Sequence, residues 1–169
     1  MALIYGFPPL ANPQSRLLIL GSMPGKASLQ AGRYYAHERN AFWRLMGDLL
    51  GAGLALDYPQ RVGKLQAAGV ALWDVMAACE RAGSLDSDIV GKSVQPNDFA
   101  TFFAVNRNIG HIFFNGAAAE ASFRRHVLPT LQGPPLRLMR LPSTSPAHAA
   151  QGYAEKLAAW SAIIALPDK

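Results

Sequence analysis

The fold is decided at residues 17–25, Leu17-Leu18-Ile19-Leu20-Gly21-Ser22-Met23-Pro24-Gly25. Four aliphatic residues in a row indicate a strand that is buried on both faces, as strands are in the middle of a parallel sheet. The glycine and proline pattern after it predicts a tight backbone turn. Ligands of open α/β sheets bind beyond the carboxyl ends of the strands, where backbone N–H groups of such a turn can meet them. Residues 21–25 are therefore the first candidate binding loop.

The segment after this turn is rich in aromatic and hydrogen-bonding side chains, and it reads Tyr34-Tyr35-Ala36-His37-Glu38-Arg39-Asn40-Ala41-Phe42-Trp43-Arg44-Leu45-Met46. From Phe42 onward, apolar residues recur every three or four positions, which predicts a core-facing helix that ends near Gly51 or Gly53. Asn40 then lies at or near the amino terminus of that helix, where asparagine is a common cap.

The rest of the chain alternates expected strands and helices. Residues 1–16 contain three prolines and predict an irregular arm, and residues 76–95 predict a polar loop too long for a mere connection. Strands are expected at 70–75, 111–116 and 136–141, and helices at 58–68, 97–106 (capped by Asn97 or Asp98), 117–127 and 151–165. Four strands separated by helices predict an α/β fold, a three-layer α/β/α sandwich around a largely parallel four-stranded sheet.

Length and composition indicate one domain spanning residues 1–169. Half of the residues are hydrophobic and only 16% are charged, which argues against a disordered chain. The single cysteine, Cys79, excludes an internal disulfide and an all-cysteine metal site, and it fits a reducing cytoplasm. No apolar run has the length of a membrane span and the first residues lack the pattern of a secretory signal, so we expect a soluble cytoplasmic protein.

The chain is basic, with a net charge of +5 and a pI near 9.7. Charge of this sign favours a polyanionic partner such as nucleic acid. Lysine and arginine are scattered along the sequence, however, so an ordinary solvated surface explains the charge equally well until a site is found.

Each of the four expected strands ends in a turn or a polar residue. In chain order these ends carry the turn 21–23, Asp74, Asn115 and Ser143. Parallel strands present their carboxyl ends to one edge of a sheet, so a single crevice would collect residues from four distant parts of the chain. Each residue also has a simpler explanation. Asn40 can be only a helix cap, Asn115 can satisfy loop backbone, and Asp74 can be a structural carboxylate.

Several common kinds of site are absent from the sequence. Residues 21–25 lack the Gly-Lys-Ser/Thr of a phosphate-binding loop and the Gly-x-Gly-x-x-Gly of dinucleotide-binding proteins, so no nucleotide cofactor is expected. Ser22, Ser143 and Ser145 lack the Gly-x-Ser-x-Gly context of serine hydrolases. His148 has no partner at metal-ligand spacing, so no metal is expected either.

Four motifs follow one another along nearly the whole chain, and they are residues 21–25, Tyr35-Ala36-His37-x-x-Asn40-x-Phe42-Trp43, Phe114-Asn115-Gly116 and Leu141-Pro142-Ser143-Thr144-Ser145-Pro146-Ala147-His148. Together they resemble the uracil-DNA glycosylase superfamily, and within it the branch of hypoxanthine-DNA (deoxyinosine) glycosylases. Trp73-Asp74-Val75 and residues 79–86 also look typical of that branch. The resemblance implies an α/β/α sandwich and a monofunctional DNA glycosylase that flips a deaminated base out of DNA without a cofactor.

The resemblance also implies roles for individual residues. The implied catalytic residues are Asn40, which orients the attacking water, and Asn115. Met23 stands where several branches have an acid or amide that positions this water, and a thioether cannot do so, which argues against uracil excision by that route. The implied base-binding residues are Ser22, Met23, Tyr35 (by stacking), Asp74 and Asn115. The implied DNA contacts are Gly25, Lys26, Pro142, Ser143, Thr144, Ser145 and His148.

Within this reading, hypoxanthine is the expected base, with uracil and xanthine left open, and we expect a monomer that acts on DNA. Three alternatives stay open at this point. One is a non-catalytic nucleic-acid-binding protein of the same fold, which Met23 would fit. Another is a uracil/thymine mismatch-type glycosylase. The third is an unrelated small-molecule hydrolase that uses Asp74 and His148.

Overall fold

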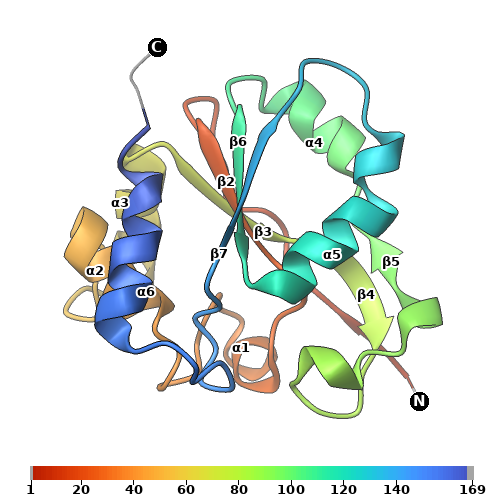
Figure 1. Ribbon diagram of the computed structural model, residues 1–169, viewed down its shortest axis with the longest axis horizontal. Coiled ribbons are helices and arrows are strands. Elements are labelled where there is room, and N and C mark those ends of the chain that lie inside the picture. Colours follow the sequence, from red (N-terminus) through yellow and green to blue (C-terminus); the bar gives the residue numbers. More distant parts are fainter. Residues whose placement is uncertain (1, 167–169) are drawn as a thin grey trace.

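The computed structural model describes residues 2–166. Its central sheet has four strands in the order β3-β2-β6-β7, which are β2 (Leu17–Gly21), β3 (Val70–Asp74), β6 (His111–Asn115) and β7 (Arg137–Leu141). All neighbouring strands in this sheet run parallel, and Figure 1 shows them crossing the middle of the molecule. β2 lies inside the sheet and is buried along its whole length, as its run of aliphatic residues predicts.

Helices cover both faces of this sheet, because the strands carry apolar side chains on alternate sides. In β2, Leu17 and Ile19 face the layer made by α2 (Phe42–Leu50), α3 (Tyr58–Ala67) and α6 (Tyr153–Trp160). Leu18 and Leu20 face the opposite layer, made by α4 (Phe99–Val105) and α5 (Ala117–His126). The three-layer α/β/α sandwich predicted from the sequence is confirmed (Figure 1).

A second sheet, made of antiparallel strands, is not predicted by the sequence patterns. It consists of β1 (Leu3–Tyr5), β4 (Met76–Glu80) and β5 (Gln95–Pro96), in the order β1-β4-β5. The prediction of an irregular arm over residues 1–16 is therefore wrong for β1, and that of a loop over residues 76–95 is wrong for β4 and β5. β1 and β5 are only three and two residues long, which is too short to show an alternating pattern.

The helices are short, and their ends differ slightly from the expected ones. An extra helix, α1 (Lys26–Ala31), begins directly after the turn 21–25. Asp98 is the residue that caps α4, because its carboxylate accepts a hydrogen bond from the Thr101 N–H. α6 ends at Trp160 and is followed by a 3-10 turn, η4 (Ser161–Ile163). The other 3-10 turns are η1 (Asp86–Asp88), η2 (Gly91–Ser93) and η3 (Leu128–Thr130). Within residues 2–166, no helix has the length and apolar character needed to cross a membrane.

Candidate functional site

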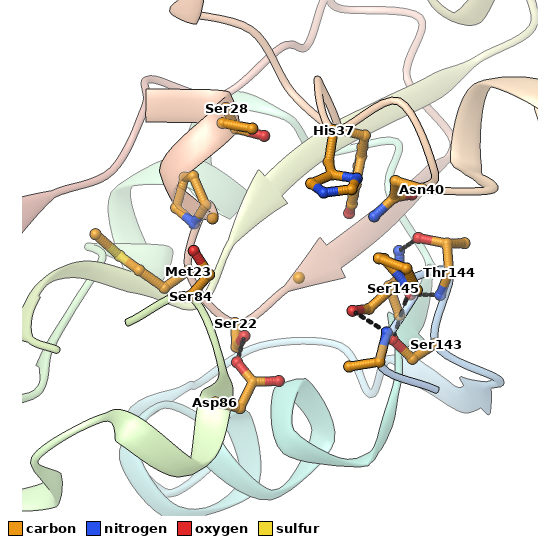
Figure 2. Close-up of a pocket in the computed structure, with 18 of the residues that line it drawn as sticks. Ser22, Met23, Ser28, His37, Asn40, Ser84, Asp86, Ser143, Thr144 and Ser145 are labelled. Atoms are coloured by element: carbon orange, nitrogen blue, oxygen red, sulfur yellow. Dashed lines mark hydrogen bonds between the residues drawn. The ribbon is translucent and has the colours of Figure 1, made fainter. Parts of the chain in front are cut away.

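A cavity of about 300 Å³ opens at the carboxyl edge of the central sheet. This volume is at the small end of the range for ligand pockets and suits a group the size of one base. Its walls come from residues 21–28, from Tyr34, Tyr35, His37 and Asn40, from residues 84–86 and 143–147, and from Asp74 and Asn115 (Figure 2). The predicted meeting of four strand ends in one crevice is confirmed.

Gly21 forms the floor of this cavity, where two polar side chains meet. A Cβ atom at Gly21 would overlap the Asp74 Oδ1 atom and would lie 3.3 Å from the Tyr35 hydroxyl. The register of β2 and β3 pairs Gly21 with Asp74, which explains why they are neighbours. Only a residue without a side chain lets Asp74 and Tyr35 come this close to the strand end.

Asp74 is buried in the floor, with 4% of its surface exposed, and its Oδ2 atom has no hydrogen-bond partner in the described part of the chain. Burial is the main cause that raises the pKa of the Asp74 carboxyl to about 7. The negative charge of Asp86 also raises this pKa, whereas the Arg81 guanidinium lowers it. Near neutral pH the carboxyl is therefore partly protonated, and in that form it can donate a hydrogen bond.

We expect the free energy of unfolding to fall as the pH rises from about 4 to about 7, because the folded protein keeps a proton on Asp74 that the unfolded chain releases near its ordinary pKa. Above pH 7 this contribution is constant. Asp74→Asn removes the ionisable group, so its free energy of unfolding should not fall over this pH range. At pH 7 it should exceed that of the wild type by a few kcal/mol. Urea unfolding at a series of pH values measures this. Asp86→Asn removes a charge that raises the pKa of Asp74, so the fall of the unfolding free energy should end at a lower pH. If the unfolding free energy of Asp74→Asn falls with pH as that of the wild type does, Asp74 is not the group that titrates.

Tyr35 stands beside the floor with one ring face already covered. Its ring stacks on Phe42, with 4.0 Å between the ring centroids, so only the other face can stack on a base. The backbone of Tyr35 has a φ of 55°, which is uncommon for a residue other than glycine and indicates local strain. Burial, followed by the charge of Asp74, raises the pKa of Tyr35, so the hydroxyl stays protonated. The predicted stacking role is compatible with this placement and stays a prediction.

Asn40 immediately precedes Ala41, the N-cap residue of α2, so it lies at the start of the helix, as predicted, without being the cap residue itself. Its Oδ1 atom accepts a hydrogen bond from the Phe42 N–H at 3.0 Å. This bond fixes which end of the amide is the oxygen, and Figure 2 shows the amide nitrogen turned toward the cavity. The group of Asn40 that faces the cavity is therefore the N–H donor, and the predicted role of Asn40 in orienting the water stays a prediction.

Asn115 is held by Thr144 through two hydrogen bonds. The Asn115 Nδ2 atom donates to the Thr144 hydroxyl at 2.9 Å, and the Thr144 N–H donates to the Asn115 Oδ1 atom at 2.9 Å. The Thr144 carbonyl also accepts from the N–H of Ala41, the neighbour of Asn40, at 3.0 Å. Thr144 thus links both predicted catalytic residues. It is only 1% exposed although it borders the cavity, and its predicted contact with DNA stays a prediction.

The loop after β7 makes its own turns beside the cavity. The Ser143 hydroxyl accepts from the Ser145 N–H at 3.2 Å, and the Ser145 hydroxyl accepts from the Ala147 N–H at 3.2 Å. Both hydroxyl protons remain available to donate to a phosphate. Gly116, with a φ of 95°, packs against Ser143, where a Cβ atom would approach the Ser143 Cβ to 3.0 Å.

Pro142 and His148, which were also predicted to contact DNA, are not among the residues that line the cavity. The Pro142 carbonyl accepts from the Trp160 indole at 2.9 Å, and the His148 carbonyl accepts from the Lys156 ammonium at 2.9 Å. Both bonds fasten the loop to α6. Contacts of Pro142 and His148 with DNA stay predictions.

Met23 borders the cavity, but its side chain packs with Met76 and Cys79 and is 7% exposed. Figure 2 shows the thioether pointing away from His37 and Asn40. The side chain therefore anchors the turn 21–25 to β4. The base-binding role predicted for Met23 would have to come from its backbone.

We expect Met23→Asn to lower the free energy of unfolding by about 1–3 kcal/mol, because it removes apolar contacts and buries an amide without partners. Met23→Leu keeps the apolar contacts and should cost less than about 1.5 kcal/mol. Urea unfolding of the two variants measures the difference. Equal stability of Met23→Asn and Met23→Leu would show that this side chain is not an anchor.

The wall made by residues 84–86 was not assigned a role in the site, although residues 79–86 are part of the resemblance to the hypoxanthine-DNA glycosylase branch. Arg81 is 5% exposed and donates from Nη2 to the Pro24 carbonyl and from Nε to the Gly83 carbonyl, each at 2.7 Å. Asp86 lines the cavity and accepts a hydrogen bond from the Ser22 hydroxyl. These bonds fasten the wall to the turn 21–25. His37, an exposed residue of the second motif, also lines the cavity and was not assigned a role.

Gly25 and Lys26 lie at the start of α1 and line the cavity, and their predicted contacts with DNA stay predictions. The Lys26 N–H donates to the Ser84 hydroxyl at 3.1 Å, so the backbone of Lys26 is used within the protein. Its side chain is exposed and can reach a phosphate.

Comparison with known proteins gives one consistent result. Residues 8–164 match the family model described as the uracil DNA glycosylase superfamily. A hypoxanthine DNA glycosylase of Methanosarcina barkeri is 38% identical over 112 residues, which cover 66% of this chain and 70% of the relative. One of Methanosarcina acetivorans is 34% identical over 144 residues, which cover 85% of this chain and 87% of the relative. A solution NMR structure described as a candidate uracil DNA glycosylase from Methanosarcina acetivorans superposes with a TM-score of 0.75 at 30% identity, covering 95% of this chain and 96% of the other. The chain thus belongs to the uracil DNA glycosylase superfamily, a family of DNA glycosylases.

Proposed function

We propose that this protein hydrolyses the N-glycosidic bond of a deaminated base in DNA, and that hypoxanthine is the preferred base. The observation that carries the proposal is the base-sized cavity at the sheet edge, lined by amide, carboxyl and aromatic groups, in a chain similar to two hypoxanthine DNA glycosylases. Such a base has to leave the duplex to enter the cavity, which costs a few kcal/mol. Stacking on the free face of Tyr35 offsets part of this cost.

Deamination reverses the hydrogen-bonding pattern of a base, and the cavity suits the deaminated form. Adenine presents a bare ring nitrogen beside an amino group, whereas hypoxanthine presents an N–H beside a carbonyl. The carboxylate of Asp86 on the cavity wall can accept from this N–H and repels the lone pair of adenine. The protonated form of Asp74 can donate to the carbonyl. Uracil and xanthine share this edge, so they remain secondary substrates of the proposal.

Hydrolysis breaks the bond between the sugar C1′ atom and the base nitrogen, and the electron pair leaves with the base. The water oxygen bonds to C1′, and a water proton passes to solvent or to the departing base. Donors that face the cavity stabilise the charge on the leaving base. We assign Asn40 to hold the water through its N–H group, because the bond to Phe42 fixes this amide in place. Two hydrogen bonds to Thr144 hold the Asn115 amide in a fixed position, and Asn115 acts from that position.

The alternative functions named in the sequence analysis differ in how well they are supported. His148 does not line the cavity that contains Asp74, which removes the support for a hydrolase that uses this pair. Within residues 2–166, no group of three His, Cys, Asp or Glu side chains is placed to hold a metal ion. If no base is released in the assay, the alternative of a nucleic-acid-binding protein without glycosylase activity is favoured.

The test uses labelled DNA duplexes that carry one deoxyinosine, deoxyuridine, deoxyxanthosine or deoxyadenosine, with alkali to cut at each abasic site. We expect cleavage of the deoxyinosine duplex first and none of the deoxyadenosine duplex. Cleavage without alkali would contradict a monofunctional enzyme and would direct attention to Lys26 at the cavity wall. No release from any lesion, with DNA still bound, would favour the binding protein.

A further inference from the structure

Tyr35 has a backbone conformation that a tyrosine rarely adopts. Its φ of 55° lies in the left-handed region, and among the described residues every other positive φ belongs to a glycine. A residue with a side chain stays in this region only where the surrounding structure fixes it. The contacts that fix Tyr35 come from the residues on either side of it.

On the amino-terminal side, two side chains hold the backbone of Tyr34. Its N–H donates to the Tyr58 hydroxyl at 3.1 Å, and its carbonyl accepts from the Trp43 indole at 2.9 Å. The Tyr34 side chain is buried as well, and its hydroxyl donates to the Pro8 carbonyl at 2.8 Å. The peptide group that precedes Tyr35 is therefore fixed in orientation, which sets the φ angle of Tyr35.

On the carboxyl-terminal side, the Ala36 N–H donates to the Ser28 hydroxyl at 3.1 Å. This bond fixes the peptide group that follows Tyr35 and, with it, the ψ angle. The Tyr35 ring stacks on Phe42, with 4.0 Å between the ring centroids, which leaves its other face for a base. The ring is thus in place before any base arrives.

Tyr58 is the member of this network that lies outside the cavity. It is the first residue of α3 and does not line the cavity. Its ring meets the Trp43 ring edge to face, with 5.8 Å between the centroids. The Arg61 and Arg33 guanidinium groups lie over the Tyr58 ring, at 5.5 and 5.8 Å from its centroid. These contacts hold the ring, and so they also hold the hydroxyl that accepts from Tyr34.

A contact with a base is stronger when the protein side of it is already ordered, because no entropy is then lost in placing the ring. Resting on the proposed function, we propose that Tyr58 is a positioning residue for base release. Its hydroxyl holds the segment that presents the Tyr35 ring to the base. Tyr58 itself touches no part of the cavity, so it acts through Tyr34 and Tyr35.

The experiment measures single-turnover base release from a deoxyinosine duplex, at a temperature where every variant is folded. Stacking of one base on an aromatic ring is worth about 5- to 150-fold, so Tyr35→Ala should lower the rate by a factor in this range. Tyr58→Phe removes one hydroxyl, keeps the ring and should lose part of the same effect, about 3- to 10-fold. An unchanged rate in Tyr58→Phe would overturn the proposal.

Tyr153→Phe is the matched control. Tyr153 is the first residue of α6, its hydroxyl bonds the Asp48 carboxylate, and the Arg44 guanidinium lies over its ring at 3.6 Å. It does not line the cavity, so the variant should keep the wild-type rate within about twofold. An equal loss in Tyr153→Phe and Tyr58→Phe would overturn the proposal, because the effect would then not depend on Tyr34.

A double-mutant cycle separates positioning of Tyr35 from every other effect of Tyr58. In the Tyr35→Ala background, Tyr58→Phe should change the rate by less than about twofold, since there is no ring left to position. A loss as large as in the wild-type background would overturn the proposal. A wild type that releases no base would overturn the proposed function, and the role of Tyr58 in base release with it.

Hydrogen exchange followed by NMR tests the same link in the protein without DNA. In Tyr58→Phe the Ala36 N–H should exchange about tenfold faster relative to the amides of β2, because the segment opens locally while the sheet stays folded. Equal acceleration at Ala36 and in β2 would show that the Tyr58 hydroxyl supports the domain as a whole, which would overturn a positioning role. Unchanged exchange at Ala36 would overturn it as well.

Discussion

Replacing Asn40 with serine should lower the single-turnover rate of base release by about 100-fold or more, while the affinity for DNA changes little. The serine hydroxyl can also accept a hydrogen bond from a backbone N–H two residues later, so the bond from the Phe42 N–H is kept. What is lost is the amide N–H group that faces the cavity and, in our proposal, holds the attacking water. Misplacing a reacting group by about 1 Å can cost about 100-fold in rate, which sets the expected size.

Two comparisons make this result specific. Asn40→Ala should lose the same activity and also about 1 kcal/mol of stability, because alanine cannot accept the hydrogen bond from the Phe42 N–H. Asn108→Ala is the control, since Asn108 bonds the Pro13 carbonyl at 2.9 Å and does not line the cavity. If Asn40→Ser keeps the wild-type rate, Asn40 only stabilises the start of α2, and catalysis has to be assigned to another group.

Replacing Thr144 with valine should lower the rate of base release about tenfold or more and cost about 1–3 kcal/mol of stability. Valine has the shape of threonine and keeps the two backbone bonds, but it leaves the Nδ2 atom of Asn115 without its acceptor. The Asn115 amide can then turn, although the bond from the Ala41 N–H to the Thr144 carbonyl is kept.

Rates of base release measured well below the unfolding temperature separate a positioning role for Thr144 from a purely structural one. There the folded fraction of Thr144→Val is close to one, so a purely structural role predicts the wild-type rate. Thr144→Ser restores the acceptor and should recover most of the activity. Full activity of Thr144→Val at low temperature would remove Thr144 from the site and leave it a role in folding alone.

The predictions from the sequence succeed where the deciding pattern is local. The run Leu17–Leu20 identifies the strand inside the sheet, and the spacing after Phe42 identifies α2. Once the strands are known to be parallel, their carboxyl ends have to share an edge, so Asp74 and Asn115 meet at one cavity. β1 and β5 escape prediction because they are too short to carry a period and depend on hydrogen bonds to β4.

The roles of single side chains depend on partners far away in the chain. Both interpretations of Asn40 follow from its position, and only the structure shows that its oxygen bonds the Phe42 N–H while its nitrogen faces the cavity. Thr144 is an exposed loop residue by its sequence context, yet it lies buried against Asn115.

The sequence alone therefore determined the sandwich, the sheet edge at which the site lies and the family to which the chain belongs. The tertiary structure decided that Asp86 reaches Ser22, that burial raises the pKa of Asp74 to about 7, and that the Tyr58 hydroxyl accepts from the Tyr34 N–H. The reason is physical. Hydrophobic periodicity is a property of neighbouring residues, whereas hydrogen-bond partners, desolvation and exposure are set by residues that only folding brings together.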